Sequence, residues 1–278
     1  MKGQIVRFGM GQLLVEGGEP ERNLERALEM IREASERKCD VVLLPECIDL
    51  AWTHPSAKKF AKPIPGQYSE LLSKCAGKFG IYVCVGLTEK YGDRVYNAAI
   101  LINSSGEIIL KYRKINVLEC AFDFYSIGDI LSVSETPFGV FGVSICSDNY
   151  IDSLEIGHTL ARMGAQVILS PSSWTVGYSY VESDDPYGEK WFKPYFILAD
   201  AYDIVVISAT SVGYIVGGPY EGKKMVGCSL AVGKQGVIAK GTYNEFAGDL
   251  FVADVTVPVR NEKGAAIGKM LKTKGVYS

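Results

Sequence analysis

The chain has 278 residues, 47% hydrophobic and 22% charged, which is the composition of an ordinary globular protein with ample material for a core. The formal net charge is −3, so no basic footprint points to nucleic acid as a partner. The first residues lack the continuous apolar stretch of a signal peptide, and no run of about 18 apolar residues predicts a membrane span.

Cysteine and histidine content limits the chemistry. The seven cysteines are scattered and include no CxxC pair, and His54 and His158 are the only histidines. Such cysteines favour free thiols in a reducing compartment, so we expect the cytoplasm. The sequence offers no zinc site, and we expect neither a metal nor another cofactor.

The first elements alternate strand and helix. Gln4–Gln12 is predicted to be a strand, and Glu19–Lys38 has apolar residues at helical spacing with charges on the other face. Asp40–Leu44 is a short continuous apolar run, which is typical of a strand buried on both faces. The run stops at Pro45, and Glu46 follows at once, so a carboxylate lies at the end of this strand.

A loop, a helix and three strands are predicted next. They cover Ile48–Gln67, Tyr68–Phe79, Ile81–Leu87, Arg94–Ile102 and Ile108–Lys114. The last two strands are joined at Ser104-Ser105-Gly106, a favourable hairpin turn. Lys114 therefore also lies at a strand end.

Cys146 also lies at the end of a predicted strand. Val140–Ile145 is predicted to be a buried strand, which is followed by a sharp turn at Cys146, a helix over about Ser153–Met163 and a second buried strand over Ala165–Leu169. Open α/β sheets place ligands and chemistry at the carboxyl ends of strands. The amino end of the next helix would also favour a thiolate. Cys146 is therefore the best nucleophile candidate in the sequence.

The remaining chain adds a loop, a helix and further strands. They cover Thr175–Glu189, Trp191–Tyr202, Ile204–Ala209, Val226–Ala231, Gly236–Ala239 and Leu250–Val257. The basic tail, about residues 258–278, is predicted to pack on a surface or a partner subunit. Because no linker interrupts the pattern, we expect one domain over residues 1–278, an α/β fold with two stacked sheets flanked by helices.

A cysteine nucleophile needs a base and an electrophilic partner. His158 lies within the helix after Cys146 and His54 lies in a loop, and a structural or solvated role is the more common one for each. Glu46 is the alternative base, because a partly desolvated carboxylate can take and return a proton. Lys114 would favour the thiolate and stabilise an oxyanion.

These residues carry a resemblance to a known family. LLPE with Glu46, YRK with Lys114 and GVSICSD with Cys146 resemble the three signatures of the nitrilase or carbon–nitrogen hydrolase superfamily, in that family's order. The resemblance covers nearly the whole chain. It implies a four-layer αββα sandwich, a homodimer or higher homo-oligomer, and no metal. Cys-Ser-Asp resembles the amidase and carbamoylase branches more than the true nitrilases.

The resemblance also implies roles for the residues. Glu46 would be general base and acid, Lys114 would stabilise the tetrahedral intermediate, and Cys146 would attack the carbon of a small amide or N-carbamoyl compound. The resulting thioester would be hydrolysed by water, with release of ammonia or an amine. The backbone N–H of Ser147 would be the second oxyanion donor. The choice between amide and N-carbamoyl substrates stays open.

The chain departs from the family pattern at two places near the site. The family often has histidine two residues after the lysine, where this chain has Asn116. The family's second glutamate falls at Ala121 in an ungapped match, with Glu119 and Asp123 on either side. Either acid is a candidate for the second carboxylate.

Loops after the strand ends supply candidate substrate-binding residues. Aromatic side chains with a few polar groups suit a small organic amide. The candidates are Trp52, His54, Tyr125, Trp174 and Tyr178.

Two other interpretations compete with an amidohydrolase. A metal-dependent phosphodiesterase can share a two-sheet sandwich, but it needs several aspartates and histidines around its metal. A non-catalytic relative could keep the fold for binding or assembly, but it would have no need of Glu46, Lys114 and Cys146 together.

Overall fold

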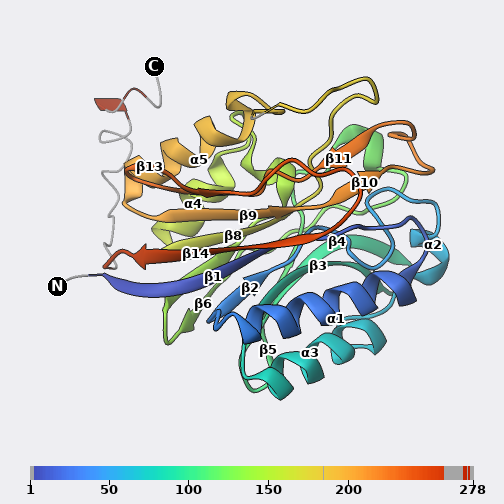
Figure 1. Cartoon of the computed structure of the whole chain (residues 1–278), viewed down its shortest axis with the longest axis horizontal. Helices are drawn as coiled ribbons and strands as arrows, with labels where there is room; N and C mark the ends of the chain where they lie inside the picture. Colours follow the sequence, from blue (N-terminus) through green and yellow to red (C-terminus); the bar gives the residue numbers. More distant parts are fainter. Residues whose placement is uncertain (1–2, 184, 260–271, 274, 276–278) are drawn as a thin grey trace.

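Two six-stranded sheets lie face to face at the centre of the protein, with helices on their outer faces (Figure 1). The computed structural model describes residues 3–183, 185–259, 272–273 and 275. Helices α1 and α3 cover the first sheet, and α4 and α5 cover the second. The predicted α/β sandwich is therefore confirmed.

The first sheet has the strand order β14-β1-β2-β3-β4-β5. Its strands are β1 (Gln4–Gln12), β2 (Val41–Leu43), β3 (Tyr82–Tyr91), β4 (Arg94–Ile102), β5 (Ile108–Arg113) and β14 (Asp249–Val257). The pairs β1–β2 and β2–β3 are parallel and the others antiparallel. Its helices are α1 (Pro20–Glu36) and α3 (Gln67–Phe79), and the short α2 (Ala57–Phe60) lies in the loop after β2.

The second sheet has the order β13-β12-β9-β8-β7-β6. Its strands are β6 (Val133–Thr136), β7 (Gly139–Val143), β8 (Val167–Ser172), β9 (Val205–Thr210), β12 (Leu230–Gly233) and β13 (Gly236–Lys240). Its helices are α4 (Glu155–Arg162) and α5 (Glu189–Tyr202). A separate small hairpin pairs β10 (Val212–Tyr214) with β11 (Lys224–Val226), and 3-10 turns span Glu119–Ala121 and Cys146–Asn149.

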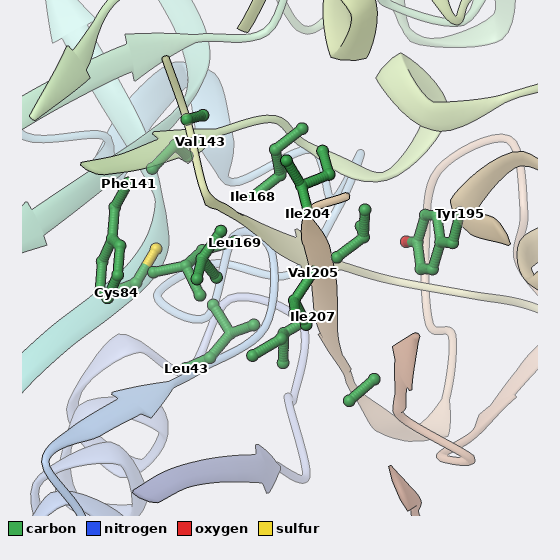
Figure 2. Packing of buried hydrophobic residues seen from close by; sticks show 14 of the residues in the cluster. Leu43, Cys84, Phe141, Val143, Ile168, Leu169, Tyr195, Ile204, Val205 and Ile207 are labelled. Atoms are coloured by element: carbon green, nitrogen blue, oxygen red, sulfur yellow. The ribbon is translucent and has the colours of Figure 1, made fainter. Parts of the chain in front are cut away.

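Alternation along the strands builds two apolar layers. Val41 and Leu43 of β2 face the second sheet, whereas Val42 packs with the residues of α1 and α3. Between the sheets, the Phe8 and Phe141 rings have centroids 6.0 Å apart. Figure 2 shows part of this layer, with Leu43 and Phe141 among its labelled side chains. The layer fixes the distance between the two sheets whose strand ends carry the site.

Most predicted elements are confirmed, two of them, Gln4–Gln12 and Arg94–Ile102, with the same bounds. The predicted strand Val226–Ala231 is wrong, because β11 ends at Val226 and β12 begins only at Leu230. Between them Gly227 and Cys228 have φ values of +70° and +60°, which no strand accommodates. Most of the tail from residue 258, for which we predicted packing on a surface or partner, lies outside the described residues.

Candidate active site

Glu46, Lys114 and Cys146 meet where strands of the two sheets end. Glu46 lies three residues after β2, Lys114 directly follows β5, and Cys146 lies three residues after β7. Nζ of Lys114 donates to Oε1 of Glu46 at 2.7 Å. The three residues are only 1%, 2% and 7% exposed, respectively. The charges of Glu46 and Lys114 both influence the pKa of the Cys146 thiol. The three residues predicted at strand ends therefore lie within electrostatic reach of one another.

The Glu46 carboxylate is held by one of its two oxygens. Oε1 accepts hydrogen bonds from Lys114 and, at 2.5 Å, from the side-chain amide of Asn97 on β4. Oε2 is buried and has no hydrogen-bond partner among the described residues. The Glu46 backbone N–H donates to the carbonyl of Ser172 at 3.3 Å, which ties this loop to the second sheet. Glu46 thus has a fixed orientation and one uncommitted oxygen.

A glycine in β3, Gly86, allows the Glu46 backbone to reach this position. A Cβ added at Gly86 would lie 2.6 Å from Cα of Glu46 and 2.8 Å from the carbonyl oxygen of Pro45, closer than real Cβ atoms approach. The Gly86 N–H also donates to the Pro45 carbonyl at 2.9 Å. Gly86 is therefore needed for the close approach of this loop.

We predict that Gly86→Ala displaces Glu46 and lowers kcat for the best substrate about 10²-fold, since displacements of about 1 Å can have that effect. Gly92→Ala is the matched control, because nothing lies within 4 Å of a Cβ at Gly92. Because Gly92 has a positive φ of 57°, alanine at this position destabilises the protein, but it does not disturb the site. Equal kcat values for the two variants would contradict the role of Gly86 in positioning Glu46.

Lys114 is fixed by backbone contacts on both sides. Its N–H donates to the carbonyl of Asn97 at 2.8 Å, and its carbonyl accepts from the N–H of Gly128 at 2.8 Å. Burial acts to lower the pKa of Lys114, but the electrostatic interactions with Glu46, Cys146 and Asp148 outweigh burial and raise it. The ammonium form is therefore maintained in the site.

Cys146 has a left-handed backbone, with φ +46°. Its carbonyl accepts a 3.3 Å hydrogen bond from the side-chain amide of Asn149. Burial, and next the charge of Glu46, raise the pKa of the Cys146 thiol to about 12, against the opposing effects of Lys114, the Ser173 backbone N–H and Lys190. The expectation that a helix amino end favours the thiolate is therefore wrong: a 3-10 turn follows Cys146, and α4 begins only at Glu155.

Asp148 joins the nucleophile turn to the lysine segment. Its carboxylate accepts hydrogen bonds from the Tyr112 hydroxyl at 2.8 Å, the Asn116 N–H at 2.8 Å and the Ile145 N–H at 2.9 Å. The Ser147 hydroxyl adds a 2.7 Å bond to the carbonyl of Asn116. Asn116, at the position where the family often has histidine, therefore holds the nucleophile turn through its backbone N–H and carbonyl. These bonds fix the turn of one sheet against the strand end of the other.

The candidates for a second carboxylate do not enter this cluster. Glu119 and Asp123 are both exposed on the surface, whereas Ala121 between them is buried. The 3-10 turn over Glu119–Ala121 leaves Glu119 exposed and buries Ala121, and Asp123 follows the turn on the surface. The cluster therefore contains neither predicted acid.

The predicted substrate-binding residues fall into different places. Trp174 is buried and follows Ser173, whose backbone N–H acts on the Cys146 thiol, and the Trp174 ring stacks on Trp191. Trp52, in the loop after Glu46, packs against Tyr220. Tyr125 is buried and accepts the Thr53 N–H at 2.9 Å, which is a structural contact.

Two further candidates have other surroundings. The His54 ring is half-buried beside glycines and its Nδ1 lies 2.7 Å from the Ser56 hydroxyl. Tyr178 is 69% exposed and its ring is tilted by 53° against that of Tyr214, so its prediction as a site residue is not supported by its position.

Sequence reasoning missed Asn97, Tyr150, Lys190 and Tyr220. Asn97 lies in the middle of β4 and binds both Glu46 and Lys114, yet a lone polar residue in a strand gives no such signal. The Cys146 thiol acts on the phenols of Tyr150 and Tyr220, and Lys190 acts on the thiol. Lys190 and Tyr220 come from segments far from Cys146 in the sequence, whereas Tyr150 follows it by four residues.

Asp49, in the loop after Glu46, anchors that loop to β3. It is fully buried and accepts from the N–H and the hydroxyl of Thr88 at 3.0 and 3.1 Å. Burial raises the pKa of Asp49 to about 7, above the value of about 3.9 for an unfolded aspartate. Its contribution to stability is therefore fully present below about pH 4 and is lost as the pH rises through 7.

We predict that Asp49→Asn removes this pH dependence. Between pH 5 and pH 7.5 the free energy of unfolding of the wild type should fall by about 2 kcal/mol more than that of the variant. Urea unfolding at the two pH values measures the difference. Parallel pH profiles for the two proteins would contradict the prediction.

The described residues form neither a cluster of metal-ligand side chains nor a helix able to span a membrane. They contain no group of three or more His, Cys, Asp or Glu side chains placed to hold a metal ion. Within the same part of the chain, no helix has the length and apolarity needed to cross a membrane.

Comparison with known proteins gives consistent matches. The sequence profile described as carbon–nitrogen hydrolase matches residues 9–262. Omega-amidase NIT2 of Xenopus tropicalis is 31% identical over 180 residues, covering 61% of this chain and 64% of that protein. A nitrilase of Pyrococcus abyssi is 34% identical over 166 residues, covering 58% and 62%. Each alignment thus spans less than two thirds of the relative's own length.

Solved structures agree in fold. Nit3 of Saccharomyces cerevisiae, a member of branch 10 of the nitrilase superfamily, superposes with a TM-score of 0.76 at 23% identity. The superposition covers 98% of this chain and 95% of that one. The likeness therefore includes both sheets and the helices outside them.

Proposed function

The chain belongs to the carbon–nitrogen hydrolase family, and on this premise we propose that it hydrolyses the C–N bond of a small amide or N-carbamoyl compound through a thioester on Cys146. The observation that carries the proposal is the Glu46 carboxylate, whose Oε1 is held by Lys114 and Asn97 while Oε2 stays unpartnered among the described residues. A carboxylate fixed through one oxygen keeps the other for proton transfer. The omega-amidase name of a relative supports an amide substrate.

We take acylation to begin from the neutral thiol, because burial and the charge of Glu46 raise the pKa of Cys146. Sγ bonds to the amide carbon while the S–H proton passes to Glu46 Oε2, and the carbonyl electron pair moves to its oxygen. Lys114 Nζ and the backbone N–H of Ser147 donate to this oxyanion. The C–N bond then breaks, and Glu46 returns the proton to the departing nitrogen, which leaves as ammonia or an amine.

Deacylation repeats these steps with water. Glu46 takes a proton from the water that attacks the thioester carbon, and Lys114 again stabilises the oxyanion. Collapse breaks the C–S bond, and the thiolate of Cys146 regains a proton from Glu46. The acid product leaves, and the enzyme returns to its starting protonation state.

Ammonia release from a panel of small primary amides and N-carbamoyl amines tests this proposal. We expect release from some members by the wild type, none by Cys146→Ala, and the best substrate to identify the branch. Release by Cys146→Ala would overturn the thioester mechanism. If neither protein releases ammonia, alkylation of Cys146 by iodoacetamide at pH 7, slowed by Glu46→Gln, still supports an activated thiol, and unchanged rates would support a scaffold.

We also propose a single domain over residues 1–278 that forms a homodimer in the cytoplasm. All seven cysteines are free thiols, which suits a reducing compartment. Apolar side chains at the two ends of the α4 region, Ile151 and Met163, are 53% and 38% exposed, which suits burial by a second copy. Sedimentation velocity should give the mass of a dimer, and a monomer at micromolar concentration would contradict this.

A further inference from the structure

Asn97 projects from β4 into the space between the two sheets. Ala99, two residues further along β4, belongs to the apolar layer between the sheets, and alternation along the strand places Asn97 on the same face. On β5, Tyr112 belongs to that layer as well, so Lys114 also faces inward. The register of β4 with β5 sets Asn97 opposite Lys114, whose N–H donates to the Asn97 carbonyl at 2.8 Å.

The side chain of Asn97 fixes one oxygen of Glu46. Its Nδ2 donates to Oε1 at 2.5 Å, and Nζ of Lys114 donates to the same oxygen at 2.7 Å. Only the NH2 end of an amide can donate to an ionised carboxylate, so this contact also determines the orientation of the amide. All three residues are buried, which leaves Oε1 with these two donors in place of water.

Packing of β4 does not account for an amide at this position. Oδ1 of Asn97 is buried and has no hydrogen-bond partner among the residues that the structure describes. A buried acceptor without a partner destabilises a protein, and an apolar side chain would avoid this cost. The amide of Asn97 therefore serves Glu46 rather than the core.

We propose that Asn97 is a positioning residue of the reaction: together with Lys114 it holds Oε1 of Glu46, so that protons pass through Oε2 only. The proposal rests on the amidase function above. Its physical basis is that hydrogen bonds to a charged oxygen stabilise the charge there, so the unbonded oxygen is the one that takes the proton. Without the amide, the carboxyl group of Glu46 can turn about its broad terminal torsion.

Asn97→Asp tests this role through the pH profile. Two carboxyl groups in contact do not both ionise until the pH is raised, and Lys114 stabilises the charge on Glu46. The proton therefore stays on the new carboxyl group, which donates to Oε1 as the amide does. Loss of this proton at higher pH removes the donor and places a like charge beside Glu46. Relative to wild type at the same pH, kcat should be highest near about pH 5.5 and fall about tenfold or more by about pH 8.5, with KM changed less than about twofold.

Asn103→Asp is the matched control. The side-chain amide of Asn103, just after β4, also donates to a glutamate, Glu107, at 2.7 Å, but this contact is exposed to solvent. Its kcat relative to wild type should not change with pH. Circular dichroism at each pH checks that both variants are folded. A pH-independent kcat ratio for folded Asn97→Asp would overturn the proposal.

A second readout does not need amide hydrolysis or a buried charge. Asn97→Leu keeps a similar side-chain volume, and site-resolved mass spectrometry gives the rate at which iodoacetamide alkylates Cys146 at pH 7. Asn97→Leu should slow this reaction about tenfold, as Glu46→Gln does, whereas Asn103→Leu should not. Slowed alkylation without hydrolysis of any amide would support the positioning of Glu46 and count against the amidase function. Amide hydrolysis with slow alkylation in Glu46→Gln but a wild-type rate in Asn97→Leu would leave the function standing and overturn the role of Asn97.

Discussion

Replacing Cys146 by alanine is expected to lower the rate of ammonia release from the best amide by a factor on the order of 10⁴ or more, since no other group can form the thioester. The fold should persist, because the turn is held by Asp148 and Asn149 and not by the thiol. Steady-state ammonia assays, with circular dichroism as the check on folding, measure both effects.

Two variants control this result. Cys75→Ala removes a largely buried thiol on α3, whose sulfur donates to the Leu28 carbonyl at 3.8 Å, and should keep full activity. Cys146→Ser keeps the size of the side chain but is a far weaker nucleophile at neutral pH, and should be nearly as inactive as alanine. Activity above a tenth of wild type in Cys146→Ala would contradict the assignment.

Glu46→Gln is expected to lower both activity and stability. The amide cannot take a proton, and general acid–base contributions of about 10²–10⁴ in rate are typical, so kcat should fall by about 10³. The substitution also leaves the ammonium of Lys114, only 2% exposed, without its closest negative partner. Breaking a buried pair in this way costs about 3–5 kcal/mol. Urea unfolding and kcat together measure the two effects.

A double variant separates the two effects. Adding Lys114→Met to Glu46→Gln removes the unpaired charge, so stability should recover by about 2 kcal/mol or more while activity stays lost. The matched surface control is Glu36→Gln, whose partner Arg32 lies 2.6 Å away but is half-exposed. That exposed pair should contribute less than about 0.5 kcal/mol. Equal losses for Glu46→Gln and Glu36→Gln would contradict the account.

The strand ends were predictable because the signal is local. Short apolar runs predicted the strands that precede Glu46, Lys114 and Cys146, and the parallel strands of such folds end at one edge. The helices predicted over Glu19–Lys38, from its helical periodicity, and over Trp191–Tyr202 were also found, as α1 and α5. These features need no knowledge of distant contacts.

The contacts that make the cluster work were not predictable in the same way. Asn97 reaches Glu46 only because β4 pairs with both β3 and β5, a matter of register between strands. The hairpin of β10 and β11 has strands of three residues each, too short for a periodic pattern. Tyr220, in the connection between these strands, therefore had no signal in the sequence.

The substrate-binding residues predicted in loops differ in burial, which the sequence did not reveal. Trp174 lies two residues after β8 and is buried, whereas Tyr178 four residues later is exposed. Aromatic composition alone does not distinguish these positions. The thiol pKa was also misjudged, because burial outweighs any effect of the following helix.

Detection of the thioester tests the central claim most directly. Wild-type protein is mixed with its best amide, quenched in acid during turnover, digested, and analysed by mass spectrometry. We predict the acyl mass on the peptide that contains Cys146, and none in Cys146→Ala. Continued ammonia release without an acyl group on Cys146, or with the group on another residue, would contradict the account.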